Sequence, residues 1–244
     1  MRDVAPHPGG NTMKLPHIVL VTGTDTGVGK TVATAALASA LQAEGRSVAV
    51  YKPCQSGDAA GDSDCTEITR LAGPLTAEAG VVLQEPLAPV PAAALDGVTL
   101  PPLAAHAARV RELASTHDHV LVEGSGGLLV ELDPDGGTLA DLGSHLGSDA
   151  TFVVVARPAL GTLNHTALTL EALERRDLAI HGVILGTWPD DPGVLEHGNR
   201  ATLGALRPLL GVLPERAAEL PPVTFQAASV HWLSGLDCLN GAWS

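Results

Sequence analysis

A glycine-rich segment between an apolar run and a helical pattern constrains the fold of this chain more than any other feature. The segment spans residues 23–31 and reads GTDTGVGKT. Residues 18–21 before it have the length and composition of a buried strand, and residues 32–44 after it are rich in alanine and leucine, as in a helix. Glycines let successive backbone N–H groups turn around phosphate oxygens, and the helix presents its positive N-terminus to the same anion. The order strand, loop, helix therefore predicts an α/β fold that binds a nucleoside triphosphate.

The chemistry of this loop follows from its last two residues. Lys30 is placed to reach the β- and γ-phosphates, and the Thr31 hydroxyl is placed for a divalent metal. The common pattern GxxxxGK[ST] needs a glycine at position 24, where this chain has Thr24, and Gly23 lies one residue too early. A glycine-rich turn without such chemistry is the alternative interpretation, but the flanking strand, helix, lysine and threonine all argue against it.

The charge of the chain limits its partners. The formal net charge is −13 over 244 residues, which excludes the basic face that duplex nucleic acids require. With that charge a phosphate site must be made locally positive, yet Lys14, Lys30 and Lys52 are the only lysines in the sequence.

The three cysteines are widely spaced and form no CxxC pair, which predicts reduced thiols in a cytoplasmic protein. No apolar stretch has the length of a membrane span.

Short apolar runs alternate with helical patterns along most of the chain. Nearly continuous apolar strands that alternate with helices predict a mostly parallel sheet covered by helices on both faces. We expect the remaining strands at residues 48–51, 120–122, 152–155, 180–185 and 210–213, and the remaining helices at residues 102–116, 162–176 and 194–206. Residues 73–102 have no clear period and predict an irregular excursion, and the tail after residue 220 predicts a loop and a small helix. Residues 1–15 predict a disordered leader or an expression remnant, and residues 16–244 a single domain.

Two more motifs follow predicted strands, and a short acidic segment follows the first of them. Lys52 begins KPCQSG, Asp64 closes GDSD, and Glu123 begins EGSGG. Ligands of an open parallel sheet bind outside the carboxyl ends of the strands, so one site could collect these side chains with Lys30. Each has a plainer alternative: Lys52 as a surface lysine and Asp64 near a helix N-cap. A carboxylate at Glu123 is costly at the end of an apolar strand unless a positive group compensates it, which favours metal coordination.

A further motif lies between the strand at 152–155 and the next helix. It covers residues 160–166 and reads LGTLNHT. Its backbone N–H groups predict a second anion site, suited to a carboxylate. The alternative is ordinary helix capping by Thr162 or Asn164.

Taken together, these motifs resemble the dethiobiotin synthetase family, with an actinobacterial character. GTDTGVGKT, KPCQSG, VEGSGGLLV and GTLNHT occur in the family's order, and the resemblance covers roughly residues 18–215. It implies a P-loop NTPase fold and a Mg²⁺-dependent ligase that uses ATP or another nucleoside triphosphate. It also implies that 7,8-diaminononanoate and carbon dioxide, or bicarbonate, form dethiobiotin through a carbamate and a carbamic–phosphoric anhydride. The implied assembly is a homodimer in the cytoplasm with its active site at the subunit interface, and no membrane or nucleic-acid partner.

The resemblance also implies a role for each matching residue. The implied catalytic residues are Lys52, Lys30 and Thr26, and the implied metal ligands are Thr31, Asp64 and Glu123. The implied nucleotide-binding residues are Gly27, Val28, Gly29, Lys30, Thr31, Val32, Asp64, Glu123, Gly124, Ser125, Gly126, Gly186, Pro214, Glu215 and Arg216. The implied substrate-binding residues are Thr24, Lys52, Ser56, Gly126 and Gly127, with Leu160, Gly161 and Asn164 supplied by the partner subunit for the distant carboxylate.

One position departs from the family. Many members place an asparagine that reads the adenine edge after the strand that we expect to end at Leu185, whereas this chain has Gly186. Glycine offers only backbone groups, which predicts relaxed selection of the base, so that CTP or another nucleotide competes with ATP.

Three other functions stay open. The first is a partitioning-type switch ATPase, whose signature lysine would stand five residues before Lys30, where this chain has Asp25. The second is a stand-alone relative of the similar domains in cobyrinate amidases or phosphotransacetylases. The third is a binding protein without activity.

Overall fold

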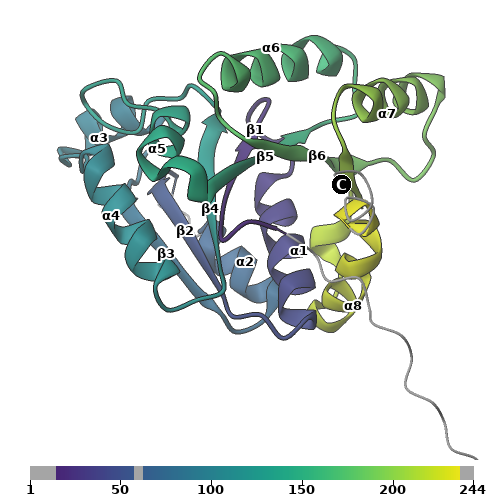
Figure 1. The fold of residues 1–244 in the computed structure, drawn as a ribbon, viewed down its shortest axis with the longest axis horizontal. Helices are drawn as coiled ribbons and strands as arrows, with labels where there is room; N and C mark the ends of the chain where they lie inside the picture. The colour runs from purple at the N-terminus through teal and green to yellow at the C-terminus, as the bar shows by residue number, and fades with distance from the viewer. Residues whose placement is uncertain (1–14, 58–62, 237–244) are drawn as a thin grey trace, which may run out of the picture.

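One parallel sheet organises the chain. The computed structural model describes residues 15–57 and 63–236, so nearly all of the leader expected at residues 1–15 lies outside the described residues. Seven strands form the sheet in the order β3-β2-β4-β1-β5-β6-β7, and every neighbouring pair is parallel (Figure 1). The strands are β1 (Ile18–Gly23), β2 (Val48–Gln55), β3 (Thr76–Val82), β4 (His119–Gly127), β5 (Ala150–Ala156), β6 (Ile180–Trp188) and β7 (Leu209–Pro214). The prediction of a P-loop α/β fold with a parallel sheet is confirmed.

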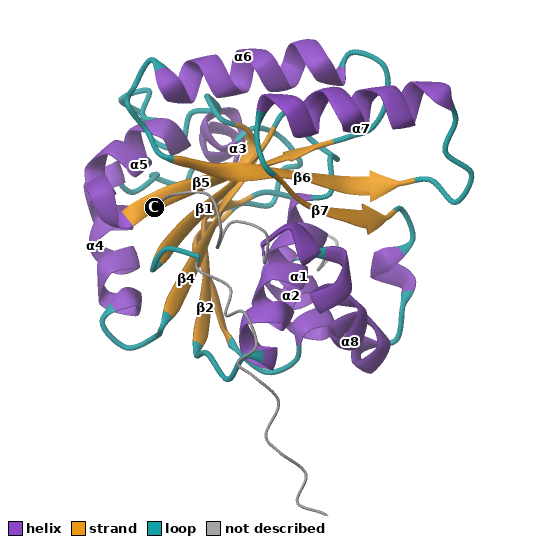
Figure 2. Cartoon of the chain, turned by 45° about the vertical axis from the view of Figure 1, so that its right-hand side comes forward, coloured by secondary structure: helices purple, strands orange, loops and turns teal. Residues whose placement is uncertain are grey.

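Helices cover both faces of the sheet. Alternation along β1 shows the two layers, because Leu20 packs into one apolar cluster and its neighbours Val19 and Val21 pack into the other. One face carries α1 (Lys30–Ala43), α2 (Asp64–Ala72) and α8 (Pro222–Trp232) (Figure 2). The other face carries α3 (Pro89–Asp96), α4 (Leu103–Ala114), α5 (Leu139–Leu146), α6 (Thr162–Glu174) and α7 (Val194–Leu206). Because both faces are covered, every residue of β1, β2 and β5 is buried.

The prediction of an irregular excursion over residues 73–102 is wrong. This stretch contains β3, which pairs with β2 at the edge of the sheet, and α3, which begins with Pro89. All residues of β3 are exposed or half-buried, so the strand lacks the apolar run that marks the central strands. Proline at the first position of a helix costs no hydrogen bond, because that N–H has no partner within the helix.

Three strands run further than predicted. Residues 48–51, 120–122 and 180–185 are apolar, but β2 continues to Gln55, β4 to Gly127 and β6 to Trp188. Pairing persists where the apolar letters stop, as in the contact of Lys52 with Ala79 of β3. Lys52, Glu123 and Gly186 therefore lie inside strands rather than after them, and the rigidity of the sheet fixes their backbones.

The tail after Leu220 forms a helix that packs on the domain. After Leu220 the chain enters α8 almost at once, with only Pro221 between, and α8 packs against α1 and α2. Among the described residues, no helix is long and apolar enough to cross a membrane.

Candidate active site

The glycine-rich loop joins β1 to α1 at the carboxyl edge of the sheet. Gly27 and Gly29 both have positive φ, 72° and 92°, a region that side-chain-bearing residues rarely adopt. Gly29 serves as the N-cap of α1, so Lys30 and Thr31 form the first turn of the helix. The N-terminus of α1 therefore faces the space enclosed by the loop, as phosphate binding requires.

Lys30 is held by the loop itself. Its Nζ donates to the backbone carbonyl of Asp25 at 3.2 Å, and the side chain is buried. Burial lowers the pKa of Lys30, an effect that nearby Lys52 reinforces and that Glu123, Asp64 and Asp25 partly offset. Position 25, where switch ATPases carry their signature lysine, thus supplies an acceptor for the loop lysine.

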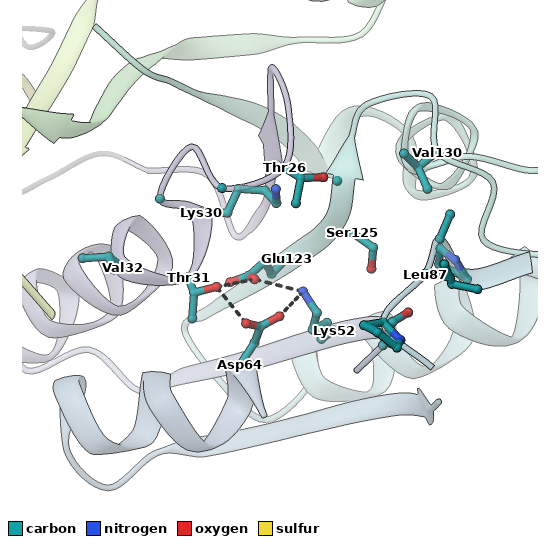
Figure 3. A pocket seen from close by; sticks show the side chains of 17 residues that line it. Thr26, Lys30, Thr31, Val32, Lys52, Asp64, Leu87, Glu123, Ser125 and Val130 are labelled. Carbon is teal, nitrogen blue, oxygen red and sulfur yellow. Dashed lines mark hydrogen bonds and ion pairs between the residues drawn. The ribbon is translucent and has the colours of Figure 1, made fainter. Parts of the chain in front are cut away.

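A cluster of four side chains lies beside the loop. Lys52 Nζ lies 2.6 Å from Asp64 Oδ2 and 3.0 Å from Glu123 Oε1 (Figure 3). Thr31 Oγ1 lies 3.0 Å from both Asp64 Oδ1 and Glu123 Oε1. The four residues come from β2, α2, β4 and α1, so the fold brings together the side chains that the sequence placed at one edge.

Burial of Lys52 and Glu123 strengthens the charge–charge interactions within this cluster. Glu123 is 0% exposed and Lys52 is 4% exposed, so the interpretation of Lys52 as a surface lysine is wrong. Burial by itself would lower the pKa of Lys52, but the charges of Glu123 and Asp64 and their hydrogen bonds outweigh it and raise the pKa. The two carboxylates therefore favour the ammonium form of Lys52. Within the described part of the chain, Glu123 Oε2 is buried without a hydrogen-bond partner.

The donor set fits a hard divalent cation such as Mg²⁺. Thr31, Asp64 and Glu123 contribute only oxygens, and magnesium takes one or two carboxylates together with substrate phosphates and water. No group of three or more His, Cys, Asp and Glu side chains able to hold a metal occurs in the described residues. A cation here would therefore take its remaining ligands from Thr31, phosphate oxygens and water.

Asp64 also occupies a defined place on α2. It is the first residue of that helix, with Ser63 as N-cap, and its backbone N–H donates to Gln55 Oε1 at 3.1 Å. The interpretation of Asp64 near an N-cap is thus correct, and it does not compete with a metal role because the carboxylate points into the cluster.

A cavity of about 780 Å³ opens above the cluster. This volume lies within the range of small-molecule sites. The predicted residues that line it are Thr26, Gly27, Gly29, Lys30, Thr31, Val32, Lys52, Ser56, Asp64, Glu123, Ser125 and Gly126. One cavity therefore joins the phosphate loop to the charged cluster.

Sequence reasoning missed an apolar wall of the same cavity. Pro86, Leu87, Ala88 and Pro89, from the connection between β3 and α3, and Val130, after β4, line it (Figure 3). Leu87 is 44% exposed and offers an apolar surface to whatever enters the cavity. The segment at residues 83–91 reads LQEPLAPVP and has no periodicity. Its cluster of prolines was the only sequence feature that could have drawn attention to it.

Eleven predicted site residues do not line this cavity. They are Thr24, Val28, Gly124, Gly127, Leu160, Gly161, Asn164, Gly186, Pro214, Glu215 and Arg216. Some of them support the cavity from behind: the Thr24 N–H donates to the Val155 carbonyl at 3.0 Å, and Val28 is fully buried. Gly124 and Gly127 lie on β4. The remaining seven form two separate groups, at β6–β7 and at the start of α6.

The β6–β7 group centres on a contact between two glycine backbones. A Cβ at Gly29 would lie 2.6 Å from the Gly186 carbonyl oxygen, and one at Gly186 would overlap the Val28 carbonyl oxygen. Gly186 thus packs directly against the phosphate loop. Pro214 ends β7 beside it, and the Glu215 N–H donates to the Trp188 carbonyl at 2.9 Å. These residues lie beside the phosphate loop, on the side of the sheet away from Lys52.

The α6 group faces outward. Leu160 is 79% exposed, and Gly161 and Asn164 are exposed as well. Gly161 is the N-cap of α6, and no side chain caps the helix, so the alternative of capping by Thr162 or Asn164 is wrong. These residues are available to another molecule and do not reach the cavity of their own chain.

Comparison with known proteins adds sequence relatives. A family model described as "AAA domain" matches residues 17–222. The chain is 51% identical over 225 residues to an ATP-dependent dethiobiotin synthetase BioD of Mycobacterium avium (strain 104), covering 90% of this chain and 98% of the relative. It is 46% identical over 233 residues to the protein of the same name from Streptomyces avermitilis, covering 93% and 94%.

Solved structures share the fold at low sequence identity. The septum site-determining protein MinD of Pyrococcus horikoshii, complexed with Mg-ADP, superposes with a TM-score of 0.59 at 17% identity, covering 93% of this chain and 97% of that one. The cell division protein FtsY of Thermotoga maritima gives 0.51 at 18% identity, covering 88% and 69%. At such identities the likeness concerns the fold alone.

Proposed function

This chain belongs to the dethiobiotin synthetase family, and from that premise we propose that its carboxyl-edge cavity converts 7,8-diaminononanoate, carbon dioxide and a nucleoside triphosphate into dethiobiotin. The observation that carries the proposal is the cluster of buried Lys52 and Glu123 with half-buried Asp64 and Thr31, which lines the same cavity as the phosphate loop and the apolar wall. A switch ATPase needs the loop but has no use for the buried lysine and the apolar wall.

The reaction that we propose has three balanced steps. An amine nitrogen attacks carbon dioxide, forms a C–N bond and loses one proton to give a carbamate. A carbamate oxygen attacks the γ-phosphorus, and the nucleoside diphosphate leaves. The second amine then attacks the carbonyl carbon, loses a proton and expels phosphate, which closes the ureido ring. The enzyme is on this proposal a cyclo-ligase that forms carbon–nitrogen bonds.

The diamine half of the site is assigned to the side of Lys52. An alkylammonium has a pKa of roughly 10, as lysine does, so the attacking amine must first lose a proton. The positive charge of Lys52 disfavours the ammonium form nearby and stabilises the carbamate anion. Ser56 and the backbones of Gly126 and Gly127 would hold the diamine end, with Thr24 behind the loop. The Leu87 and Val130 wall suits the alkyl chain.

The phosphate half is assigned to the loop. Its backbone N–H groups, Lys30 and Thr26 would hold the β- and γ-phosphates, and their charge stabilises the transferring group. Thr31, Asp64 and Glu123 would hold a magnesium ion, which would supply positive charge close to the phosphates. Val28, Val32, Gly124 and Ser125 complete the nucleotide site that we propose, and the base would lie toward Gly186 and residues 214–216.

The distant carboxylate of the diamine is assigned to a second subunit. Leu160, Gly161 and Asn164 are exposed and lie outside their own cavity, as residues donated to a partner would. The positive N-terminus of α6 at Gly161 suits a carboxylate. We therefore propose a homodimer in which each cavity is completed by the other chain.

A product assay tests the function directly. The protein is incubated with diaminononanoate, bicarbonate, Mg²⁺ and each nucleotide in turn, and dethiobiotin is sought by its mass. We expect product that depends on nucleotide. Absence of product with every nucleotide, from a protein that is folded and binds nucleotide, would overturn the proposal.

Base selectivity gives a second prediction. Gly186 presents no side chain to the base, so discrimination that depends on side-chain hydrogen bonds is lost. We expect initial rates with CTP or another nucleoside triphosphate within about tenfold of those with ATP. The rates are compared at equal nucleotide concentration under the same conditions. A strong preference for ATP would show that other groups read the adenine.

A further inference from the structure

We propose that Lys52 is the resident counter-ion of the metal site, so that its ammonium must leave Asp64 and Glu123 before a divalent cation can bind them. Binding of the cation would then release Lys52 from the carboxylates and make its ammonium available to the reacting amine. This inference rests on the proposed function for the fate of Lys52, but the competition itself can be measured without diamine.

The first argument is the occupation of the carboxylate oxygens. Asp64 Oδ2 and Glu123 Oε1 lie 2.6 Å and 3.0 Å from Lys52 Nζ, and Asp64 Oδ1 lies 3.0 Å from Thr31 Oγ1. Of the four carboxylate oxygens, Glu123 Oε2 alone has no hydrogen-bond partner among the described residues, so both oxygens of Asp64 are already engaged. Magnesium binds oxygens at about 2.1 Å. A cation that bridged Asp64 and Glu123 would thus come within a few ångströms of an ammonium that already contacts both, in a buried setting where like charges repel strongly.

The second argument is charge balance. Two carboxylates and one ammonium leave the cluster with a single formal negative charge, and Lys30 lies nearby with its own positive charge. A divalent cation alone would make this buried region strongly positive. A nucleotide that binds together with the cation neutralises the excess positive charge with its phosphates. The released Lys52 then lies in a cavity that holds anions. Loading by cation and nucleotide together is therefore favoured over loading by cation alone.

The third argument is that the second lysine does not share this task. Lys30 Nζ donates to the Asp25 carbonyl, and it forms no ion pair with Asp64 or Glu123. Lys52 lines the cavity that Ser56 also lines, and its Nζ lies 3.5 Å from the Gly124 carbonyl oxygen. Lys52 contacts both carboxylates, whereas Lys30 acts on them only through its charge at longer range, so Lys30 is the matched control for direct contact.

Direct metal binding tests the competition. Free Mn²⁺ is measured by electron paramagnetic resonance during titration of the nucleotide-free protein. We expect Lys52→Met to bind Mn²⁺ about tenfold or more tightly than the wild type, since two uncompensated carboxylates remain. Lys30→Met removes the same charge from the same cavity and should change the affinity by less than about threefold. Equal tightening in both variants, or none in Lys52→Met, would overturn the proposal.

A measurement on the unaltered protein covers the case in which Lys52→Met fails to fold. With three lysines in the sequence, a ¹⁵N-lysine sample has at most three ammonium signals, which Lys→Arg variants assign. On addition of Mg²⁺ with a non-hydrolysable nucleotide, we expect the Lys30 signal to report binding and the Lys52 signal to shift or to exchange with water. A Lys30 response with an unchanged Lys52 signal would contradict the displacement. Neither experiment requires turnover, so a missing dethiobiotin product would leave this inference standing.

Discussion

Replacement of Lys52 by methionine is expected to lower turnover by about 100- to 1000-fold, the effect typical of removing one preorganised charge from a reacting centre. Methionine keeps most of the side-chain length but removes the positive charge that would lower the pKa of the substrate amine and stabilise the carbamate. The loop lysine Lys30 is held by the Asp25 carbonyl rather than by Lys52, so nucleotide affinity measured without divalent cation should change far less than turnover. Initial rates of dethiobiotin formation and equilibrium nucleotide binding separate the two effects.

Arg70 provides the matched control for this variant. It lies on α2, six residues from Asp64, where it pairs with Glu67 on the surface and donates to the Ala218 carbonyl at 2.6 Å, and it makes no contact with the cluster. Arg70→Met removes one positive charge close to the site without touching it and should leave the rate within about twofold, as exposed pairs contribute little. Near-normal turnover in Lys52→Met would remove Lys52 from the role that we propose.

Replacement of Gly186 by asparagine is expected to damage the enzyme rather than to restore adenine reading. Any Cβ at this position overlaps the Val28 carbonyl oxygen and lies 2.7 Å from Val155 Cγ1. Overpacking of this kind costs about 1–3 kcal/mol, so the phosphate loop must shift. We expect the melting temperature to fall by roughly 3–10 °C and kcat/KM for the nucleotide to fall about 10- to 100-fold.

Gly198→Asn is the control for a glycine in an open position. Gly198 lies on α7, where a Cβ would meet no atom within 4 Å. Its substitution should leave both the melting temperature and the nucleotide kinetics close to the wild type, because asparagine is tolerated in a helix slightly better than glycine. A Gly186→Asn protein that melts like the wild type and gains a preference for ATP would refute the close-packing argument.

Much of the fold was predictable because runs of apolar residues in the sequence mark the buried strands. The apolar letters of β1, β4 and β5 located the centre of the sheet, and the glycine loop fixed the first crossover. β3 was not predictable, because its half-exposed TAEAGVV sequence is held in place by pairing with β2 rather than by its own pattern. α5 did carry a usable signal: Thr138 and Asp141 form a capping box at its start.

Part of the candidate site could likewise be predicted from the sequence, and part of it could not. Lys52, Asp64 and Glu123 could be brought together from sequence, because parallel strands deliver their carboxyl ends to one edge. The apolar wall at Leu87 could not, since its position depends on the connection between β3 and α3. The contact of Gly29 with Gly186 was also out of reach, because two segments far apart in the chain meet there only in three dimensions.

The strand order has a consequence for how such an enzyme can change. Lys52 lies on β2 and Gly186 on β6, and the order β2-β4-β1-β5-β6 places them four strands apart. At about 4.8 Å per strand this is roughly 19 Å, beyond the range over which substitutions usually interact. On the assignment of the base that we propose, substitutions on the β6 side that spare the contact of Gly186 with the phosphate loop would change nucleotide selection without acting directly on Lys52. The phosphate loop on β1 lies between the two ends and is the part that neither adaptation can alter freely.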